Sequence, residues 1–150
     1  MTLKQRLRDD LTAAIKDRDE LRTGTLRMAL AAVTNEEVAG KVARELDDDE
    51  VVAVLGREAK KRREAAEAFD EAGRAELATR ERAEGDVLAT YLPAQLSDED
   101  LTALVAEAIA ETGADSPKAM GQVMKLIQPR LTGRAEGGRV AVEVRRQLGA

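Results

Sequence analysis

The chain has 150 residues and a net charge of −5, and it contains one Phe, one Tyr and no Trp. It has neither cysteine nor histidine, which excludes disulfides, thiol nucleophiles, thiolate or imidazole metal ligands and the usual general base near neutral pH. No apolar run approaches the roughly 20 residues of a membrane span, and the N-terminus starts with a charged amphipathic pattern rather than a secretory signal. We therefore expect a cytoplasmic protein without a membrane span. An Ala-rich composition with many Glu, Lys and Arg and only three prolines favours helix throughout.

Two helices are predicted before residue 41. Thr2 can cap the first, and an entirely charged turn follows it at residues 17–20. The second ends near Gly40, which suits the position just after a helix. The apolar stripe of the first helix recurs every four residues, at Leu3, Leu7, Leu11 and Ile15. The second helix carries an apolar face of Leu26, Ala29, Leu30 and Val33.

Two longer helices are predicted next. The acidic residues 47–50 signal the start of the third, which runs to about Ala72, before Gly73. Its middle carries the basic run 60–63, which we interpret as a solvated face or as long side chains packed on a neighbour. The fourth helix spans Ala75 to Tyr91, with a polar middle.

The stretch from Thr90 to Leu101, TYLPAQLSDEDL, marks a boundary. Pro93 disfavours the α conformation at the residue before it, so the fourth helix should end there. Ser97 can cap the next helix, which begins with three acidic residues on the positive end of the helix dipole. We predict an N-terminal helical domain at residues 1–93 and a small helical tail domain at residues 94–150.

Three shorter helices are predicted in the tail domain. The fifth helix has a regular apolar stripe and stops at Gly113. The sixth begins at Ser116-Pro117, and a glycine-rich turn at residues 131–138 leads to the last helix. The expected core of these two helices consists of Met120, Val123, Met124, Val140 and Val144. No alternating strand pattern occurs, so the predicted fold class is all-α, with about four helices in an N-terminal bundle and three in the C-terminal domain.

No self-sufficient active site is visible. The acidic clusters at residues 47–50 and 98–100 are explained as helix starts, and both serines lie at cap positions. The glycine-rich turn has no strand before it, so it is not a dinucleotide site, and no phosphate-binding loop motif occurs. We therefore predict no catalytic residues, no metal site and no cofactor.

Charge is distributed unevenly in the second part of the chain. Residues 95–115 hold six acids and no Lys or Arg, whereas residues 116–150 hold seven basic residues and two acids. An anionic partner is one interpretation, and basic solvent faces of short helices are the other. Glycines, a helix N-terminus and arginines together suit phosphate, and with so few aromatic residues an RNA would be held by its backbone and shape. The candidate RNA contacts are Lys125, Arg130, Arg134, Arg139, Arg145 and Arg146.

Three motifs in order resemble those of a known family. Residues 91–97 match its Y-L-P-x-Q-L-S hinge, residues 120–124 match its M-G-x-V-M helix, and residues 133–137 are similar to its G-K/R-A-D-G turn. Segments at residues 26–28, 35–36 and 57–62 also fit. Over essentially its whole length the chain resembles the YqeY-like proteins, stand-alone relatives of the C-terminal part of GatB, which is one of the subunits of the tRNA-dependent Asp/Glu amidotransferase. Glu136 stands where the family usually has Asp, and it is a poorer helix cap.

The resemblance implies two helical domains, the second being a tail module that helps the amidotransferase hold tRNA. It also implies a link to carbon–nitrogen ligation with glutamine as the amide donor, although that chemistry belongs to other domains of the enzyme. The hypothesis is a non-catalytic module that binds tRNA or another structured RNA, with an amidotransferase as a protein partner. The alternative is a protein–protein interaction module that binds no RNA. An enzyme would need a donor site that the residues do not supply.

Overall fold

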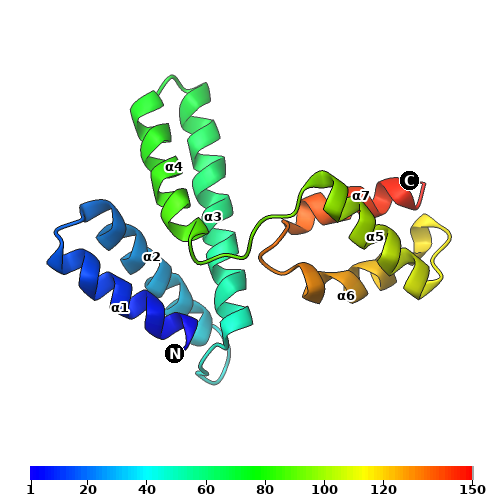
Figure 1. Cartoon of the computed structure of the whole chain (residues 1–150), viewed down its shortest axis with the longest axis horizontal. Coiled ribbons are helices and arrows are strands. Elements are labelled where there is room, and N and C mark those ends of the chain that lie inside the picture. The colour runs from blue at the N-terminus through cyan, green and yellow to red at the C-terminus, as the bar shows by residue number, and fades with distance from the viewer. Residues whose placement is uncertain (150) are drawn as a thin grey trace. The chain divides into compact units, whose positions relative to one another are not determined.

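The computed structural model describes residues 1–149, which form seven α-helices and one short 3₁₀ helix and contain no β-strand. The predicted all-α class is confirmed. The chain divides into two compact units, the N-terminal unit Met1–Leu92 and the C-terminal unit Pro93–Ala150 (Figure 1).

The N-terminal unit contains α1 (Leu3–Lys16), α2 (Glu20–Glu37), α3 (Asp48–Glu71) and α4 (Ala75–Ala89). Local signals begin these helices as the sequence predicts. The Thr2 hydroxyl accepts a hydrogen bond from the Gln5 N–H, and the Asp47 carboxylate accepts one from the Glu50 N–H; both caps are reciprocal capping boxes. The charged turn at residues 17–20 is confirmed, since α1 ends at Lys16 and Asp19 caps α2.

One apolar core holds the N-terminal unit together. Its fully buried large side chains are Leu7, Leu26, Val33, Val51, Leu55 and Leu88. The predicted stripe of α1 is wrong at its last member, because Ile15 is 48% exposed and Ala14 is buried in its place. A four-residue repeat drifts by about 40° per step on a helix of 3.6 residues per turn, so Ile15 has rotated off the face that carries Leu7.

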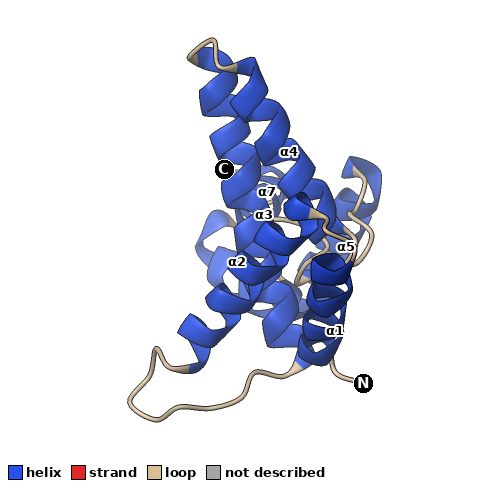
Figure 2. Cartoon of the chain, turned by 90° about the vertical axis from the view of Figure 1, so that its left-hand side faces the viewer, coloured by secondary structure: helices blue, strands red, loops and turns tan. Residues whose placement is uncertain are grey.

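The end of α2 also differs from the prediction. The helix stops at Glu37 with Val38 as its C-cap, and Gly40 lies in the following loop instead of at the helix end. Residues 38–45 of this loop are all exposed, and Figure 2 shows the loop standing away from the helices before it joins α3. The Arg44 N–H donates to the Glu37 carbonyl and the Leu46 N–H to the Glu37 carboxylate, so Glu37 alone makes two of the contacts that hold the loop. A third is the ion pair between Arg44 and Glu50 at 2.7 Å.

Helices α3 and α4 form a hairpin whose connected end extends beyond α1 and α2 (Figures 1 and 2). Gly73 makes the turn with φ of 73°, a conformation that residues with a side chain rarely adopt. Helix α4 ends at Ala89 and not at Tyr91, but Tyr91 still packs in the core of the N-terminal unit.

The C-terminal unit contains α5 (Asp98–Thr112), a 3₁₀ helix (Pro117–Ala119), α6 (Met120–Leu131) and α7 (Gly137–Gln147). Ser97 caps α5 by accepting from the Asp100 N–H at 3.1 Å, and Gly113 ends it in the left-handed conformation, as predicted. The start predicted at Ser116 is corrected: Ser116 makes no side-chain cap, and a 3₁₀ turn precedes the helix proper.

The three α-helices of the C-terminal unit pack on one another around a second core. Met120 and Met124 pack at its edge in a partly buried position. The buried members on the three helices are Leu101, Val105, Ala108, Val123, Ile127, Leu131, Val140 and Val144. The predicted core residues of α6 and α7 are therefore confirmed.

Candidate functional site

The hinge motif and the glycine-rich turn contact each other. The Leu96 N–H donates to the Arg134 carbonyl at 2.9 Å, and the Gln95 Nε2 donates to the Gly133 carbonyl at 2.7 Å. Two stretches that look separate in the sequence thus form one arrangement within the C-terminal unit. We call this arrangement the clasp, formed by Gln95, Leu96, Asp98, Gly133, Arg134 and Arg139.

Arg139 closes the clasp from the first turn of α7. Its Nη1 donates to the Leu96 carbonyl at 2.8 Å, and its Nη2 donates to the Asp98 carboxylate at 2.7 Å. Because the Leu96 N–H is bonded to Arg134, both backbone polar groups of Leu96 are held within the clasp. The Asp98 side chain is 96% exposed, so its ion pair with Arg139 lies in solvent and contributes little to stability beyond its geometry.

The turn between α6 and α7 has two kinds of glycine. Gly133 adopts φ of 75°, which a residue with a side chain would adopt only with strain. Gly137 and Gly138 open α7 with ordinary φ, and a Cβ on either would meet no atom within 4 Å. Glu136 occupies the N-cap position but makes no side-chain cap hydrogen bond, as expected for a residue longer than the usual capping Asp.

Two further predicted contacts are held by carboxylates. Arg130 pairs with Glu111 at 2.8 Å, and this hydrogen bond raises the pKa of Arg130. Arg146 binds both oxygens of Glu143, at 3.0 and 2.5 Å. The hydrogen bonds from Arg146 and Gln147 lower the pKa of Glu143 to about 2.

The other three predicted contacts are placed differently. The side chains of Lys125, Arg134 and Arg145 form no ion pair with any Asp or Glu in residues 1–149. Lys125 and Arg145 are exposed, and Arg134, whose carbonyl is part of the clasp, is half-buried. The structure therefore brings Arg134 and Arg139 together around Leu96, pairs Arg130 and Arg146 with carboxylates elsewhere, and leaves three of the six predicted contacts, Lys125, Arg134 and Arg145, without a carboxylate partner among the described residues.

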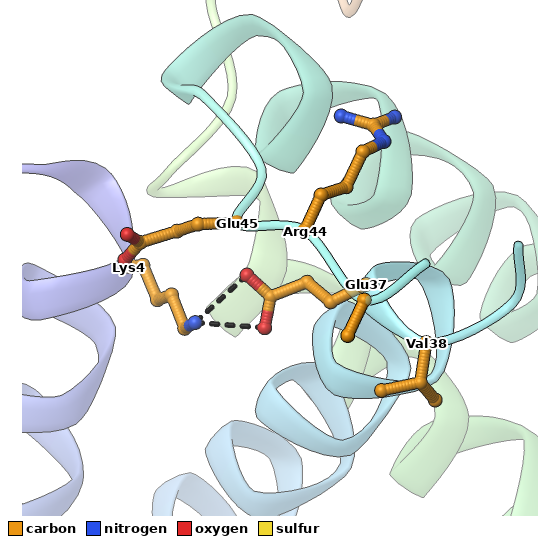
Figure 3. Close-up of a pocket in the computed structure, with 6 residues that line it drawn as sticks. Lys4, Glu37, Val38, Arg44 and Glu45 are labelled. Atoms are coloured by element: carbon orange, nitrogen blue, oxygen red, sulfur yellow. Dashed lines mark hydrogen bonds and ion pairs between the residues drawn. The ribbon is translucent and has the colours of Figure 1, made fainter. Parts of the chain in front are cut away.

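A second candidate lies in the N-terminal unit, where a shallow depression opens beside the loop after α2 (Figure 3). Lys4 reaches from α1 to both carboxylate oxygens of Glu37 at 2.8 Å. This hydrogen bond, followed by the one from the Leu46 N–H, lowers the pKa of Glu37. Lys4 and Glu37 therefore neutralise each other in this depression. Its other lining residues belong to the loop after α2.

A comparison with known protein families agrees with the resemblance carried by the three motifs. The family model described as Yqey-like protein matches residues 4–148. The chain belongs to the YqeY-like family. No curated protein matches this sequence.

In this YqeY-like protein, the structure assigns roles that sequence reasoning missed. Gln95 and Asp98 are clasp residues, and Glu111 and Glu143 are the carboxylates that engage two of the tail arginines. The signal for Gln95 was present, because it is a named position of the hinge motif. For Asp98 the sequence predicts only a role in starting a helix, and Asp98 is indeed the first residue of α5.

Residues 1–149 of the YqeY-like chain contain no group of three or more Asp or Glu side chains placed to hold a metal ion. Among the same residues, no helix is both long and apolar enough to cross a lipid bilayer.

Proposed function

We propose that this YqeY-like protein is a non-catalytic accessory module that binds tRNA or another structured RNA through the basic tail of its C-terminal unit. The observation that carries the proposal is the set of tail cations Lys125, Arg134 and Arg145, which have no carboxylate partner within the described residues. They belong to residues 116–150, a stretch with seven basic residues and two acids.

Phosphate binding favours cations that need not first give up a carboxylate. An arginine already paired in the protein must exchange one anion for another, which reduces its net contribution to affinity. Lys125, Arg134 and Arg145 are therefore the main contacts in this proposal, and Arg130, Arg139 and Arg146 contribute less. With a single Tyr and a single Phe in the chain, binding would depend on phosphate contacts and RNA shape, and hence strongly on salt.

Work beside a tRNA-dependent amidotransferase, with glutamine as amide donor, is the finer part of this proposal. It rests on the relationship between the YqeY-like family, whose hinge and tail motifs this chain carries, and the C-terminal part of GatB. In this arrangement the protein would hold RNA and the partner enzyme would carry out the carbon–nitrogen ligation, since this chain has neither cysteine nor histidine. Addition of the protein should then lower the tRNA concentration at which the amidotransferase is half-saturated.

The test is a titration of total cellular tRNA into the purified protein at two salt concentrations. We expect steeply salt-dependent binding, and the variant Lys125→Gln/Arg134→Gln should bind more weakly with a log–log salt slope lower by about 1–2. The matched control is Lys60→Gln/Lys61→Gln, which removes the same charge from α3, where both lysines pair with glutamates. Absence of binding at low salt would contradict RNA docking, and equal effects of the two variants would remove the tail as its location.

A second function is favoured by one observation in the N-terminal unit. Val38 and Val42 in the loop after α2 are 58% and 78% exposed, although valine is usually buried. A protein partner that packs on this loop would cover them. A specific protein that co-purifies with the wild type but not with Val38→Ser/Val42→Ser, in the absence of tRNA affinity, would establish this function in place of RNA binding.

A further inference from the structure

The chain is anchored to the N-terminal unit immediately before Pro93. Tyr91 is 5% exposed, its hydroxyl donates to the Asp10 carboxylate, and the Arg6 guanidinium lies 4.7 Å from the centre of its ring. Burial, and then the hydrogen bond with Asp10, raise the pKa of Tyr91, so its hydroxyl stays a donor at neutral pH. Leu92 packs against the same core, and its N–H donates to the Ala89 carbonyl.

The chain is anchored to the C-terminal unit immediately after Ala94. The Gln95 side chain bonds to the Gly133 carbonyl, and both backbone groups of Leu96 are bonded within the clasp. The Leu96 side chain is buried in the core of that unit. Three independent kinds of contact therefore hold residues 95 and 96: a side-chain hydrogen bond, two backbone hydrogen bonds and apolar packing.

Only Pro93 and Ala94 remain between these anchors, and both are exposed. Pro93 contributes one contact, since its carbonyl accepts from the Gln95 Nε2 at 3.3 Å. We propose that Pro93–Ala94 is a two-residue hinge, and that the clasp keeps it this short. The stretch between α4 and α5 spans residues 90–97, but most of it belongs to one unit or the other.

Torsional freedom within this hinge is restricted further by proline. The pyrrolidine ring fixes the φ angle of Pro93, and it pushes Leu92 toward extended conformations. The remaining soft angles are ψ of Pro93 and both angles of Ala94. Rotation between the two units thus concentrates at Ala94, and Arg139 acts as a positioning residue that keeps Leu96 out of the flexible segment. This inference stands whether or not the tail binds RNA.

The first test measures ¹⁵N relaxation along the full-length wild-type chain. Order parameters should be about 0.85 at Tyr91, Leu92 and Leu96, as in the helices, and should fall below about 0.6 only at Ala94. Low values throughout residues 91–97 would overturn the proposal, because the linker would then be loose. A value at Ala94 equal to that of the helices would overturn it as well, because there would be no hinge.

The second test asks whether the clasp sets the hinge length. The chain has no cysteine, so Lys16→Cys and Lys118→Cys, both at exposed positions, allow one spin label in each unit. We expect Gln95→Ala/Arg139→Met to broaden the distance distribution between the labels and to lower the order parameter at residue 95. The control Gln122→Ala/Arg145→Met removes the same side-chain types from exposed positions outside the clasp and should leave the distribution unchanged. Equal distributions for both variants would show that the clasp does not limit the hinge, and helix chemical shifts confirm folding.

Discussion

The two basic stretches of this chain, residues 60–63 and the tail at residues 116–150, differ in how far their charges are paired within the protein. The run Lys60–Arg63 on α3 is the densest cluster of positive charge in the sequence, but each of its residues interacts with a partner, chiefly glutamates of α3 and α4. The basic residues of the tail are spread from Lys118 to Arg146, and three of the six predicted contacts remain without a carboxylate in the described chain. Density of charge along a sequence therefore does not predict which charge is available to a ligand.

The difference arises from what lies opposite each stretch. Arg62 points into the α3–α4 hairpin, where Glu58, Glu81 and Glu84 lie within 4.0 Å of its guanidinium. The acidic segment at residues 98–115 supplies Asp98 and Glu111 to the tail, but it reaches only two of its arginines. An arginine that faces a neighbouring helix is neutralised by the carboxylates of that helix. A basic side chain on the outer face of a helix is surrounded by solvent.

The largest effect is expected at Arg62, which is 21% exposed on its side chain. Arg62→Ala would leave the Glu81 carboxylate without its ion pair inside the hairpin, and Glu58 and Glu84 would each keep only one cation. We therefore expect a loss of about 2–3 kcal/mol in the free energy of unfolding. Urea denaturation measures it. Lys60→Ala, on the exposed side of the same helix, should change stability by less than about 0.5 kcal/mol. Equal losses in the two variants would mean that the hairpin does not depend on the network.

A smaller effect is expected at the clasp. Arg139→Met removes two hydrogen bonds, one of them to a backbone carbonyl, and should lower the unfolding free energy of the C-terminal unit by about 1–2 kcal/mol. Arg145→Met, a change of the same type on the same helix, should have an effect within about 0.5 kcal/mol. Thermal unfolding monitored by circular dichroism compares them. A larger loss in Arg145→Met would contradict the assignment of Arg139 as the structural arginine of α7.

The smallest expected effect is a dependence of the free energy of unfolding on pH. The pKa of Glu143 is lowered from 4.5 to about 2 in the folded protein, so its contacts contribute stability above pH 4.5 and lose it as the pH falls toward 2. Because Arg146 is solvent-exposed, we expect a contribution of about 1 kcal/mol. Urea midpoints measured across this range should fall less steeply in Glu143→Gln than in the wild type. The exposed acid Glu99, changed to Gln, serves as the control and should retain the wild-type slope.

Prediction from the sequence worked best where structure depends on neighbours in the chain. Thr2 and Ser97 cap the helices that they are predicted to cap, the acidic residues 47–50 begin α3 as predicted, and Gly113 ends α5 in the left-handed conformation. The errors at Ile15 and Gly40 have the same origin. In each, a short sequence pattern was consistent with a helix face or a helix end. Packing in the core determines that Ala14 is buried in α1 and Ile15 is not. The end of α2 lies at Glu37, whose carboxylate binds the loop that follows.

The candidate site was less accessible to sequence reasoning. The six basic residues were chosen by charge and position, and nothing in their spacing separates Arg139, which closes the clasp, from Arg145, which is exposed. The hinge and the glycine-rich turn were each recognised as motifs. Their contact with each other was not, because a motif describes one segment and the clasp joins two.

The sequence by itself determined the all-α class, most helix boundaries, the composition of the two cores and the family. These depend on interactions between residues a few positions apart and on the period of apolar residues, both of which can be read along the chain. Only the tertiary structure decided which cations are neutralised and how much of the linker is free. Those outcomes depend on contacts such as Gln95–Gly133, Asp98–Arg139 and Leu96–Arg139, which join residues 38 to 43 positions apart and form only when α5 and α7 pack together.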